Sequence, residues 1–338
     1  MRLSRKITAA LKLTVAIALL AWLATSGRLD FGVLKGVVQH WHWLILAQVT
    51  FGLVQLMIAF RWRRLLQIVG VQCTVGQAFK LILGGLFFNQ LLFGSTGGDV
   101  YRVMALGAGR PKQRPAVLVS VIADRVIGLF ALIVLVPIGA IINVELIREN
   151  SFLAYAVFGA LALSMLVPGL IWLILSRSAK WRKRNRDNLR ESQLRRGIAY
   201  IETLFEPFVQ HQLVLWKSLL FSVVIYILIV ATNILLAFGL LGTDISWQPF
   251  LLLIPIAHLG MAIPINPPGA LGTGEALYSY LLNLAGVSQG SIVSLLQRAT
   301  TILWSLPGWL VLVLPSTSAG SAGGQIGDRE SAIRLEEK

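Results

Sequence analysis

The sequence predicts an all-α polytopic membrane protein with about six full spans and two re-entrant helical hairpins, arranged as an inverted repeat. The 338 residues are 56% hydrophobic and only 13% charged, which is roughly half the charged fraction of a soluble domain. Glycine-rich breaks interrupt the apolar sequence at 89–99 and 264–275, and an acidic residue closes each break. Non-helical backbone is costly at membrane depth unless it is buried in protein or lines a cavity. Two such breaks, one in each half, indicate a binding site between related halves.

Apolar runs of about 20 residues mark the full spans, because a helix of that length crosses the hydrocarbon core. Basic residues set the orientation, since Lys and Arg are enriched in cytoplasmic loops. Arg2, Arg5 and Lys6 therefore place the N-terminus in the cytoplasm. No small-residue cleavage site follows the first run, so we expect an uncleaved span, with a secretory signal as the alternative. The runs are 7–25, 43–60, 116–142, 152–175, 213–240 and 291–314.

The first hairpin is predicted over residues 75–110. It lies between two basic clusters, at 61–64 and 102–114, that both belong in the cytoplasm. A single crossing would separate these clusters, and the arm at 99–109 is too short and polar to permit two crossings. The chain is therefore expected to dip in from the cytoplasm and to turn back at a glycine-rich tip. The glycines of this tip are Gly94, Gly97 and Gly98.

The segment 176–212 is predicted to be a basic cytoplasmic connector. It carries nine Lys or Arg residues and four Asp or Glu residues. Apolar residues recur in it at helical spacing, which predicts an amphipathic helix on the membrane surface. We expect this helix to be attracted to anionic headgroups, with a partner-binding helix as the alternative. The apolar positions are Leu194, Ile198, Ile201, Phe205 and Phe208.

The second hairpin is predicted over residues 249–286. The preceding span, 213–240, ends outside, and the arm at 275–286 has 12 residues, which are too few to cross. This hairpin is therefore expected to dip in from the periplasmic face. The span 291–314 then returns the tail, 315–338, to the cytoplasm, and the polar composition of the tail predicts disorder. The glycines of the second tip are Gly269, Gly272 and Gly274.

Residues 1–314 are thus predicted to form a single membrane domain built from two halves, 43–175 and 213–314. Each half contains a hairpin with a glycine-rich tip, a closing acid and then a span with a buried arginine. The halves run in opposite orientations, as do the inverted repeats of transporters. Both chain termini lie in the cytoplasm in this topology.

Arg125 and Arg298 are the strongest candidates for a binding role. Each lies roughly 10–14 Å into its span, where a charge costs at least ~2.5–3.5 kcal/mol and needs a partner or a wet cavity. The planar guanidinium suits a phosphate, so two of them suit an anionic headgroup. Asp124 adjoins Arg125, but neighbours on a helix point about 100° apart. We therefore expect separate partners, such as Asp99 for Arg125 or Arg102 for Asp124, and a purely structural ion-pair network is the alternative.

The closing acids, Asp99 and Glu275, stand where helices are predicted to begin. We interpret them as N-terminal caps, with proton coupling as the alternative. Asn89 and Asn266 are expected to satisfy backbone groups at the two tips. The predicted headgroup cavity comprises Arg125, Arg298, Asp99, Arg102, Asp124, Glu275, Asn89 and Asn266.

Other function classes find little support in the sequence. The net charge of +15 is distributed over short loops, without a nucleic-acid-binding pattern, so no nucleic-acid partner is expected. Cys73 is the only cysteine, and the histidines lack metal-ligand spacing except at His40 and His42, which we interpret as an interfacial anchor. No hydrolase, nucleotide-binding or zinc-protease motif occurs. We predict no catalytic residue, no metal and no cofactor.

Three blocks of sequence resemble the lysylphosphatidylglycerol synthase transmembrane-region family, also called flippase-like membrane proteins. The blocks are 88–102, with Phe-Asn-Gln at its start, 124–129, which begins Asp-Arg-Val, and 264–275. The resemblance extends from about residue 6 to residue 314. The first block departs from the usual pattern, which has proline at the tip where this chain has Phe93-Gly94-Ser95-Thr96.

The resemblance implies a bacterial or archaeal inner-membrane protein that handles lipids. In the multiple peptide resistance factor, such a domain moves aminoacylated phosphatidylglycerol between leaflets, and a soluble synthase domain follows it. The present chain has no synthase-like sequence after residue 314, so lipid aminoacylation is not expected.

We therefore expect a lipid flippase that moves an anionic or amino-modified phospholipid, or a polyprenyl-linked lipid, between leaflets. Its partners would be membrane phospholipids with anionic headgroups, together with a second copy of the chain or an envelope-synthesis protein. One alternative is an intramembrane polyprenyl-phosphate glycosyltransferase that uses Asp99 or Asp124 as a base. The other is a non-transporting accessory subunit of a lipid or envelope-synthesis complex.

Overall fold

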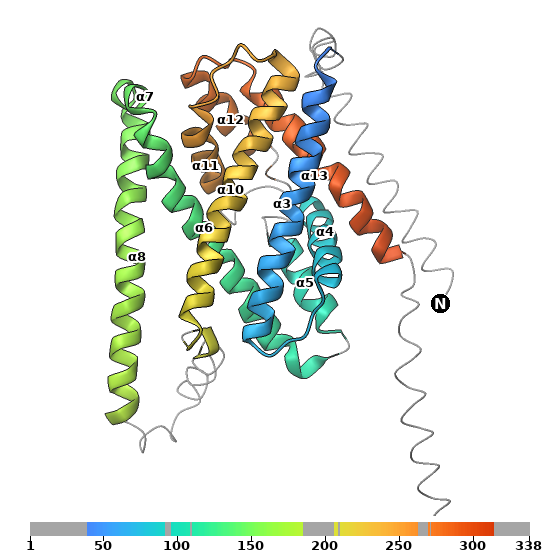
Figure 1. The fold of residues 1–338 in the computed structure, drawn as a ribbon, viewed down its shortest axis with the longest axis vertical. Helices are drawn as coiled ribbons and strands as arrows, with labels where there is room; N and C mark the ends of the chain where they lie inside the picture. The colour runs from blue at the N-terminus through green and yellow to red at the C-terminus, as the bar shows by residue number, and fades with distance from the viewer. Residues whose placement is uncertain are drawn as a thin grey trace, which may run out of the picture.

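A computed structural model describes residues 39–91, 96–108, 110–184, 206–208, 210–262, 270 and 272–313. The regular structure in these residues is entirely helical (Figure 1). In chain order the helices are α3 (Trp41–Ile68), α4 (Val75–Leu91), α5 (Gly97–Leu106), the 3-10 turn η1 (Pro111–Gln113), α6 (Arg114–Ile141), α7 (Val144–Glu149), α8 (Ser151–Arg184), α10 (Gln212–Leu241), α11 (Phe250–Met261), α12 (Thr273–Leu284) and α13 (Gly290–Val313).

Three of the described helices are long and apolar enough to cross a membrane, namely α3, α10 and the continuous stretch of η1 and α6. They coincide with three of the predicted spans, those at 43–60, 116–142 and 213–240. Helices α8 and α13 contain two more of the predicted runs. Helix α8 continues to Arg184, so the predicted connector at 176–212 begins inside this helix.

Several predicted features lie outside the described residues. They are the span at 7–25, most of the amphipathic connector, the tail at 315–338, and parts of both hairpin tips, including Gly94, Asn266 and Gly269.

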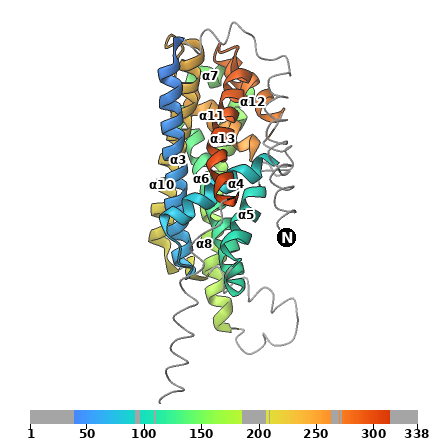
Figure 2. The same ribbon diagram turned by 90° about the vertical axis from the view of Figure 1, so that its right-hand side faces the viewer.

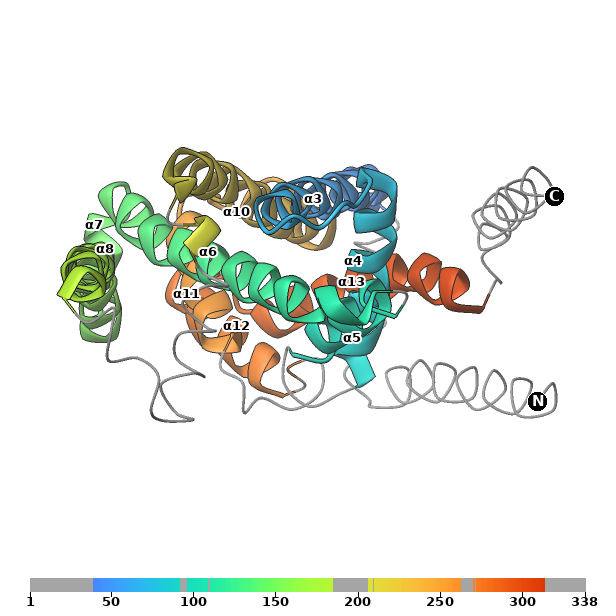
Figure 3. The ribbon, with the colours of Figure 1, turned by 90° about the horizontal axis from the view of Figure 1, so that it is seen from below.

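Two helical hairpins stand at the positions that the sequence predicts. The pair α4 and α5 lies within 75–110, and the pair α11 and α12 lies within 249–286. Each hairpin packs against the long helix of the other half: α4 packs against α13, and α11 packs against α6. Helices α3 and α10 pair with each other along one edge of the molecule (Figure 2). Helix α8 stands apart at another edge and contacts α6 and α7 (Figure 3).

Glycines permit these close helix crossings. A Cβ atom on Gly139 of α6 would collide with the backbone of Leu251 in α11. A Cβ atom on Gly308 of α13 would likewise collide with the backbone of Leu83 in α4. Small residues of this kind let helix backbones approach closely in membranes. A glycine therefore permits close backbone packing both where α6 meets α11 and where α13 meets α4.

The first hairpin is closed by a further glycine contact. A Cβ atom on Gly98, at the start of α5, would collide with the carbonyl oxygen of Gly85 in α4. Gly85 lies four residues before Asn89 on α4. Its contact with Gly98 brings the backbones of α4 and α5 directly together. The ring of Tyr101 then stacks on Phe88 with centroids 4.7 Å apart. Tight closure places the first turn of α5 next to α6, where the polar residues of the site gather.

Candidate functional site

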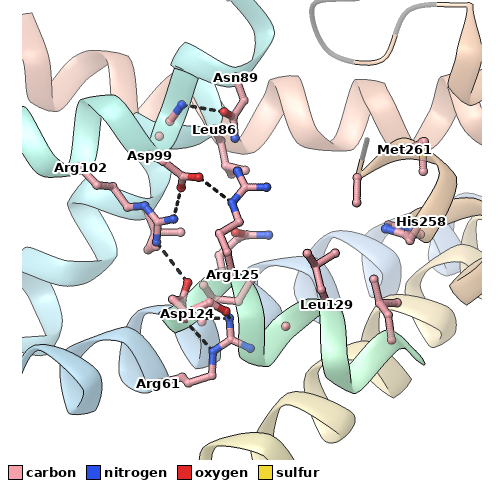
Figure 4. Close-up of a pocket in the computed structure, with 18 of the residues that line it drawn as sticks. Arg61, Leu86, Asn89, Asp99, Arg102, Asp124, Arg125, Leu129, His258 and Met261 are labelled. Carbon is pink, nitrogen blue, oxygen red and sulfur yellow. Dashed lines mark hydrogen bonds and ion pairs between the residues drawn. The ribbon is translucent and has the colours of Figure 1, made fainter. Parts of the chain in front are cut away.

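Five charged side chains form an alternating chain where α3, α5 and α6 meet (Figure 4). Arg61 Nε donates to Asp124 Oδ1 at 2.9 Å, and Arg102 Nη1 donates to Asp124 Oδ2 at 3.3 Å. Arg102 Nη2 also donates to Asp99 Oδ1. Arg125 Nε completes the series by donating to Asp99 Oδ2 at 2.6 Å. We call these five residues the ion chain.

The helical positions of the residues explain the order of the ion chain. Asp124 and Arg125 are neighbours on α6, and their side chains diverge by about 100°, so they reach different partners. Asp99 and Arg102 are three residues apart on α5 and share one face of that helix. The sequence predicted both cross-helix pairings, that of Arg125 with Asp99 and that of Asp124 with Arg102, and the structure confirms them.

Burial and charge vary along the ion chain. At one end Arg61 and Asp124 are almost completely buried, whereas the side chain of Arg125 at the other end is 33% exposed. Three arginines face two aspartates, so the ion chain as a whole carries one excess positive charge. Buried ions are tolerated only when they are paired and hydrogen-bonded, and the buried end meets this condition. The excess charge can therefore act on a ligand at the Arg125 end.

Additional contacts hold the buried end in place. Arg61 Nη1 donates to the hydroxyl of Ser222 on α10 at 2.6 Å. The guanidinium of Arg102 lies 5.0 Å from the ring of Trp62, a geometry that favours a cation–π interaction. Trp62 is fully buried, and its Nε1 donates to Ser120 Oγ at 3.2 Å. The ion chain thus has a rigid base and an accessible end.

A cavity of about 360 Å³ lies beside the ion chain. This volume falls at the lower end of the range for small-molecule pockets, ~300–1,000 Å³. Both halves contribute to its walls, which include Arg125 from α6 and His258 from α11. From the predicted set, the lining residues are Asn89, Gly98, Asp99, Arg102, Asp124 and Arg125; the others include Gln55, Arg61, Leu86, Leu129, Tyr226, His258, Met261 and Ala270.

Asn89 serves the hairpin backbone, as the sequence predicted. Its Oδ1 accepts a hydrogen bond from the N–H of Gly98 at 2.6 Å. This bond satisfies one of the free N–H groups at the start of α5. Asn89 also lines the cavity, so the bond stabilises the tip at the wall that a ligand would meet.

The second half holds a separate ion pair. Arg298 Nη2 lies 2.8 Å from Glu275 Oε1, and the two side chains are each only 8% exposed. Arg298 also donates to the carbonyl oxygen of Ala270 at 3.2 Å. Neither Arg298 nor Glu275 is among the residues that line the cavity. The structure therefore does not bring the two predicted arginines together in this cavity.

The two closing acids have different roles. The N–H of Gly272 donates to Glu275 Oε2 at 2.7 Å, so Glu275 caps the start of α12 as predicted. The capping interpretation does not hold for Asp99 within the described residues: the start of α5 shows no side-chain cap there, and both Asp99 oxygens bind arginines instead. The reason is that Asp99 lies within reach of two arginines, Arg102 on α5 and Arg125 on α6, whose full positive charges attract a carboxylate more strongly than a backbone N–H does.

One arginine, Arg61, was misplaced by its sequence context. The sequence assigned it only to the basic cytoplasmic cluster at 61–64, whereas the structure buries it in the ion chain beside Arg102, which the sequence had already placed in the predicted cavity. Helix α3 continues to Ile68, which is seven residues past Arg61 and roughly 10 Å farther along the axis. Apolar residues beyond Arg61, namely Trp62, Leu65 and Leu66, are the signal that the helix continues.

A second polar series, which the sequence did not reveal, approaches the cavity from the other half. The hydroxyl of Tyr278 on α12 donates to Asn233 Oδ1 on α10 at 3.0 Å. His258 Nε2 on α11 lies 3.3 Å from the same hydroxyl. Asn233 and Tyr278 are fully buried, whereas His258 reaches the cavity wall.

Comparison with known proteins agrees with this arrangement. The family model for the lysylphosphatidylglycerol synthase TM region matches residues 9–314. The chain belongs to this family. A UPF0104 membrane protein of Methanothermobacter thermautotrophicus (strain Delta H) is 23% identical over 305 residues, which are 85% of this chain and 87% of the archaeal protein. No solved structure matches the chain. Membership of this family and the apolar helices indicate a membrane protein and are consistent with a lipid-related role.

Proposed function

We propose that this protein is a lipid flippase of the cytoplasmic membrane of a bacterium or archaeon. The observation that carries the proposal is the placement of Arg125, a part-exposed cation at the end of a net-positive ion chain and on the wall of a cavity shared by both halves. A guanidinium in such a position suits the phosphate of an anionic or amino-modified phospholipid, or of a polyprenyl-linked lipid. The acyl chains would remain in the bilayer while the headgroup passes through the cavity.

The proposed topology is an inverted repeat with two re-entrant hairpins. The support for this topology is that each hairpin packs on a long helix of the other half. Helix α4 packs on α13, and α11 packs on α6. The paired glycines Gly139 and Gly308 add to that support. In this topology one hairpin enters from each side of the membrane, and both chain termini are cytoplasmic. A reporter fused after Leu314 tests the topology, because a periplasmic reporter would contradict the orientation of the second hairpin.

The ion chain supplies a mechanism for headgroup capture. An incoming phosphate would compete with Asp99 for the guanidinium of Arg125. Asp99 would keep its bond to Arg102, so no carboxylate would be left as an unpaired charge. Because Asp99 belongs to the hairpin and Arg125 to α6, the exchange would loosen one tie between these elements. Binding of the headgroup would in this way be coupled to movement of the hairpin.

The same geometry makes the glycosyltransferase alternative less suitable. A general base needs a carboxylate oxygen that is available to a substrate proton. Each oxygen of Asp99 and Asp124 already binds an arginine, so a substrate proton would have to compete with a guanidinium for it. We therefore favour transport over intramembrane catalysis, and an assay for product from a labelled sugar donor separates the two because flipping forms no new bond.

Transport of acyl-chain-labelled phospholipid in proteoliposomes tests the proposal. We expect Arg125→Ala to abolish the movement of labelled lipid, because the excess charge at the cavity is removed. Arg148→Ala on α7 is the matched control and should transport as the wild type does. A monodisperse elution profile shows that each variant is folded. Wild-type transport by folded Arg125→Ala protein would contradict the assignment, and a wild-type protein that binds lipid without moving it would favour the accessory-subunit alternative.

A further inference from the structure

His258 is held in a defined tautomer by the polar series behind it. Asn233 Nδ2 donates to the carbonyl oxygen of Ile229 at 2.8 Å, which identifies Asn233 Oδ1 as the acceptor. The hydroxyl of Tyr278 uses its single proton to donate a hydrogen bond to that Oδ1 at 3.0 Å. The Tyr278 oxygen can therefore only accept a hydrogen bond from His258 Nε2, 3.3 Å away. His258 therefore carries its proton on Nε2.

This tautomer leaves Nδ1 of His258 as a hydrogen-bond acceptor. In a neutral imidazole one ring nitrogen donates and the other accepts. Within the described part of the chain, Tyr278 is the hydrogen-bond partner of the ring. The ring lines the cavity, and it lies across from the ion chain in Figure 4. The cavity thus has a cationic donor, Arg125, on one wall and a neutral acceptor on the opposite wall.

We propose that His258 determines headgroup specificity by accepting a hydrogen bond from a hydroxyl or ammonium group that lies beyond the lipid phosphate. The proposal rests on the proposed function, in which Arg125 binds the phosphate. A headgroup that has both the phosphate and a hydroxyl or ammonium donor can bind Arg125 on one wall and His258 on the other at the same time. A phosphodiester that ends in a methyl group satisfies only Arg125 and leaves the His258 acceptor without a donor, and an unsatisfied polar group of this kind weakens binding.

Three acyl-chain-labelled lipids with the same phosphodiester test this specificity. Phosphatidylglycerol offers hydroxyl donors, phosphatidylethanolamine offers ammonium donors, and phosphatidylmethanol offers neither. We expect the wild-type protein to transport at least one of the two donor lipids roughly three- to tenfold faster than phosphatidylmethanol, the factor that corresponds to one hydrogen bond. Which of the two is favoured identifies the donor as a hydroxyl or an ammonium group.

Variants of His258 then separate specificity from transport. His258→Leu should lower the ratio of the rate for the favoured donor lipid to the rate for phosphatidylmethanol to about one. His258→Asn should restore part of the preference, because Asn Oδ1 can replace the Nδ1 acceptor. His42→Leu, at the exposed start of α3, is the matched control. Should His258→Leu fail to fold, Tyr278→Phe replaces it and should reduce the preference, because the proton on the imidazole is no longer held at Nε2.

The outcomes distinguish this inference from the proposed function. An unchanged preference in His258→Leu, or no preference in the wild type, would overturn the role of His258. If Arg125→Ala abolished transport of all three lipids in that case, the flippase assignment would still stand. Competition between phosphatidylglycerol and phosphatidylmethanol for the purified protein, followed by native mass spectrometry, provides a readout that does not depend on transport. Equal occupancy by the two lipids in wild-type and His258→Leu protein would also overturn the inference.

Discussion

The ion chain of the first half and the Glu275–Arg298 pair of the second half occupy corresponding places, yet they differ in charge balance and access. In both halves an acid at the start of the second hairpin helix pairs with an arginine on the following long helix. The pair of the second half is neutral and sealed. The ion chain has one excess positive charge and ends at a cavity.

This difference separates an ion pair that is sealed from solvent from one that is open to a cavity. In the sealed pair, Glu275 and Arg298 neutralise each other and have little contact with water. The main contribution of this pair is therefore to hold α12 against α13. The ion chain is open at Arg125 and carries more positive than negative charge, so an anion in the cavity would be attracted to it. We infer that the first half binds the headgroup phosphate, whereas the second half provides the stable counterpart and the polar wall that includes His258.

The largest effect on stability is expected at the sealed pair. Arg298→Met would leave Glu275 buried without its partner, and such losses cost about 3–5 kcal/mol of unfolding free energy. Arg125→Met should cost less than about 1 kcal/mol, because Asp99 keeps Arg102 and the remaining ion chain is neutral. Unfolding in mixed micelles with SDS measures both. A larger destabilisation in Arg125→Met than in Arg298→Met would reverse our comparison.

An intermediate effect is expected at the starts of the two second hairpin helices. Gly98→Ala would force a Cβ atom against the Gly85 carbonyl, and overpacking against backbone costs about 1–3 kcal/mol. Gly274→Ala should cost less, because its nearest neighbour is the flexible thioether of Met261 at 3.2 Å. Gly76→Ala, which meets open space, is the control. Thermal unfolding of the purified variants tests this order, and equal losses at the two hairpins would argue against a tighter first hairpin.

The smallest effect is expected beneath the buried end of the ion chain. Trp62→Phe removes the hydrogen bond to Ser120 and weakens the contact with Arg102. We expect a loss of about 1 kcal/mol in unfolding free energy, with transport retained, because Arg102 keeps both aspartates. Within the described residues Arg298 has no corresponding aromatic contact, so this variant also measures how much the additional packing contributes. A loss of transport without a loss of stability would show that Trp62 acts on the cavity directly.

Helix positions were predictable because they depend on local sequence. Apolar runs and glycine-rich breaks identified α3, α6, α10 and both hairpins to within a few residues at most ends. The exceptions occur where a helix continues through charged sequence. Helix α3 extends past Arg61, and α8 extends to Arg184. Charged residues normally end a span, but a buried partner such as Asp124 permits Arg61 to remain inside the helix.

The site was only partly predictable, for a different reason. Adjacent residues on α6 had to seek different partners, so the pairings of Asp124 and Arg125 followed from helical geometry. No local pattern indicates that Arg61 meets a residue 63 positions later in the chain. The same holds for His258 and Asn233, which are joined only through Tyr278.

The sequence by itself determined the helical architecture, the two breaks and the family of this protein, because hydropathy, helix periodicity and glycine placement are properties of neighbouring residues. The tertiary structure alone decided which charges are sealed and which face the cavity. That distinction depends on how α3, α5, α6, α11 and α12 pack, since burial and hydrogen bonding between distant segments set the free energy of each charge. The two closing acids are alike in sequence, and packing made one a cap and the other the link to a cavity.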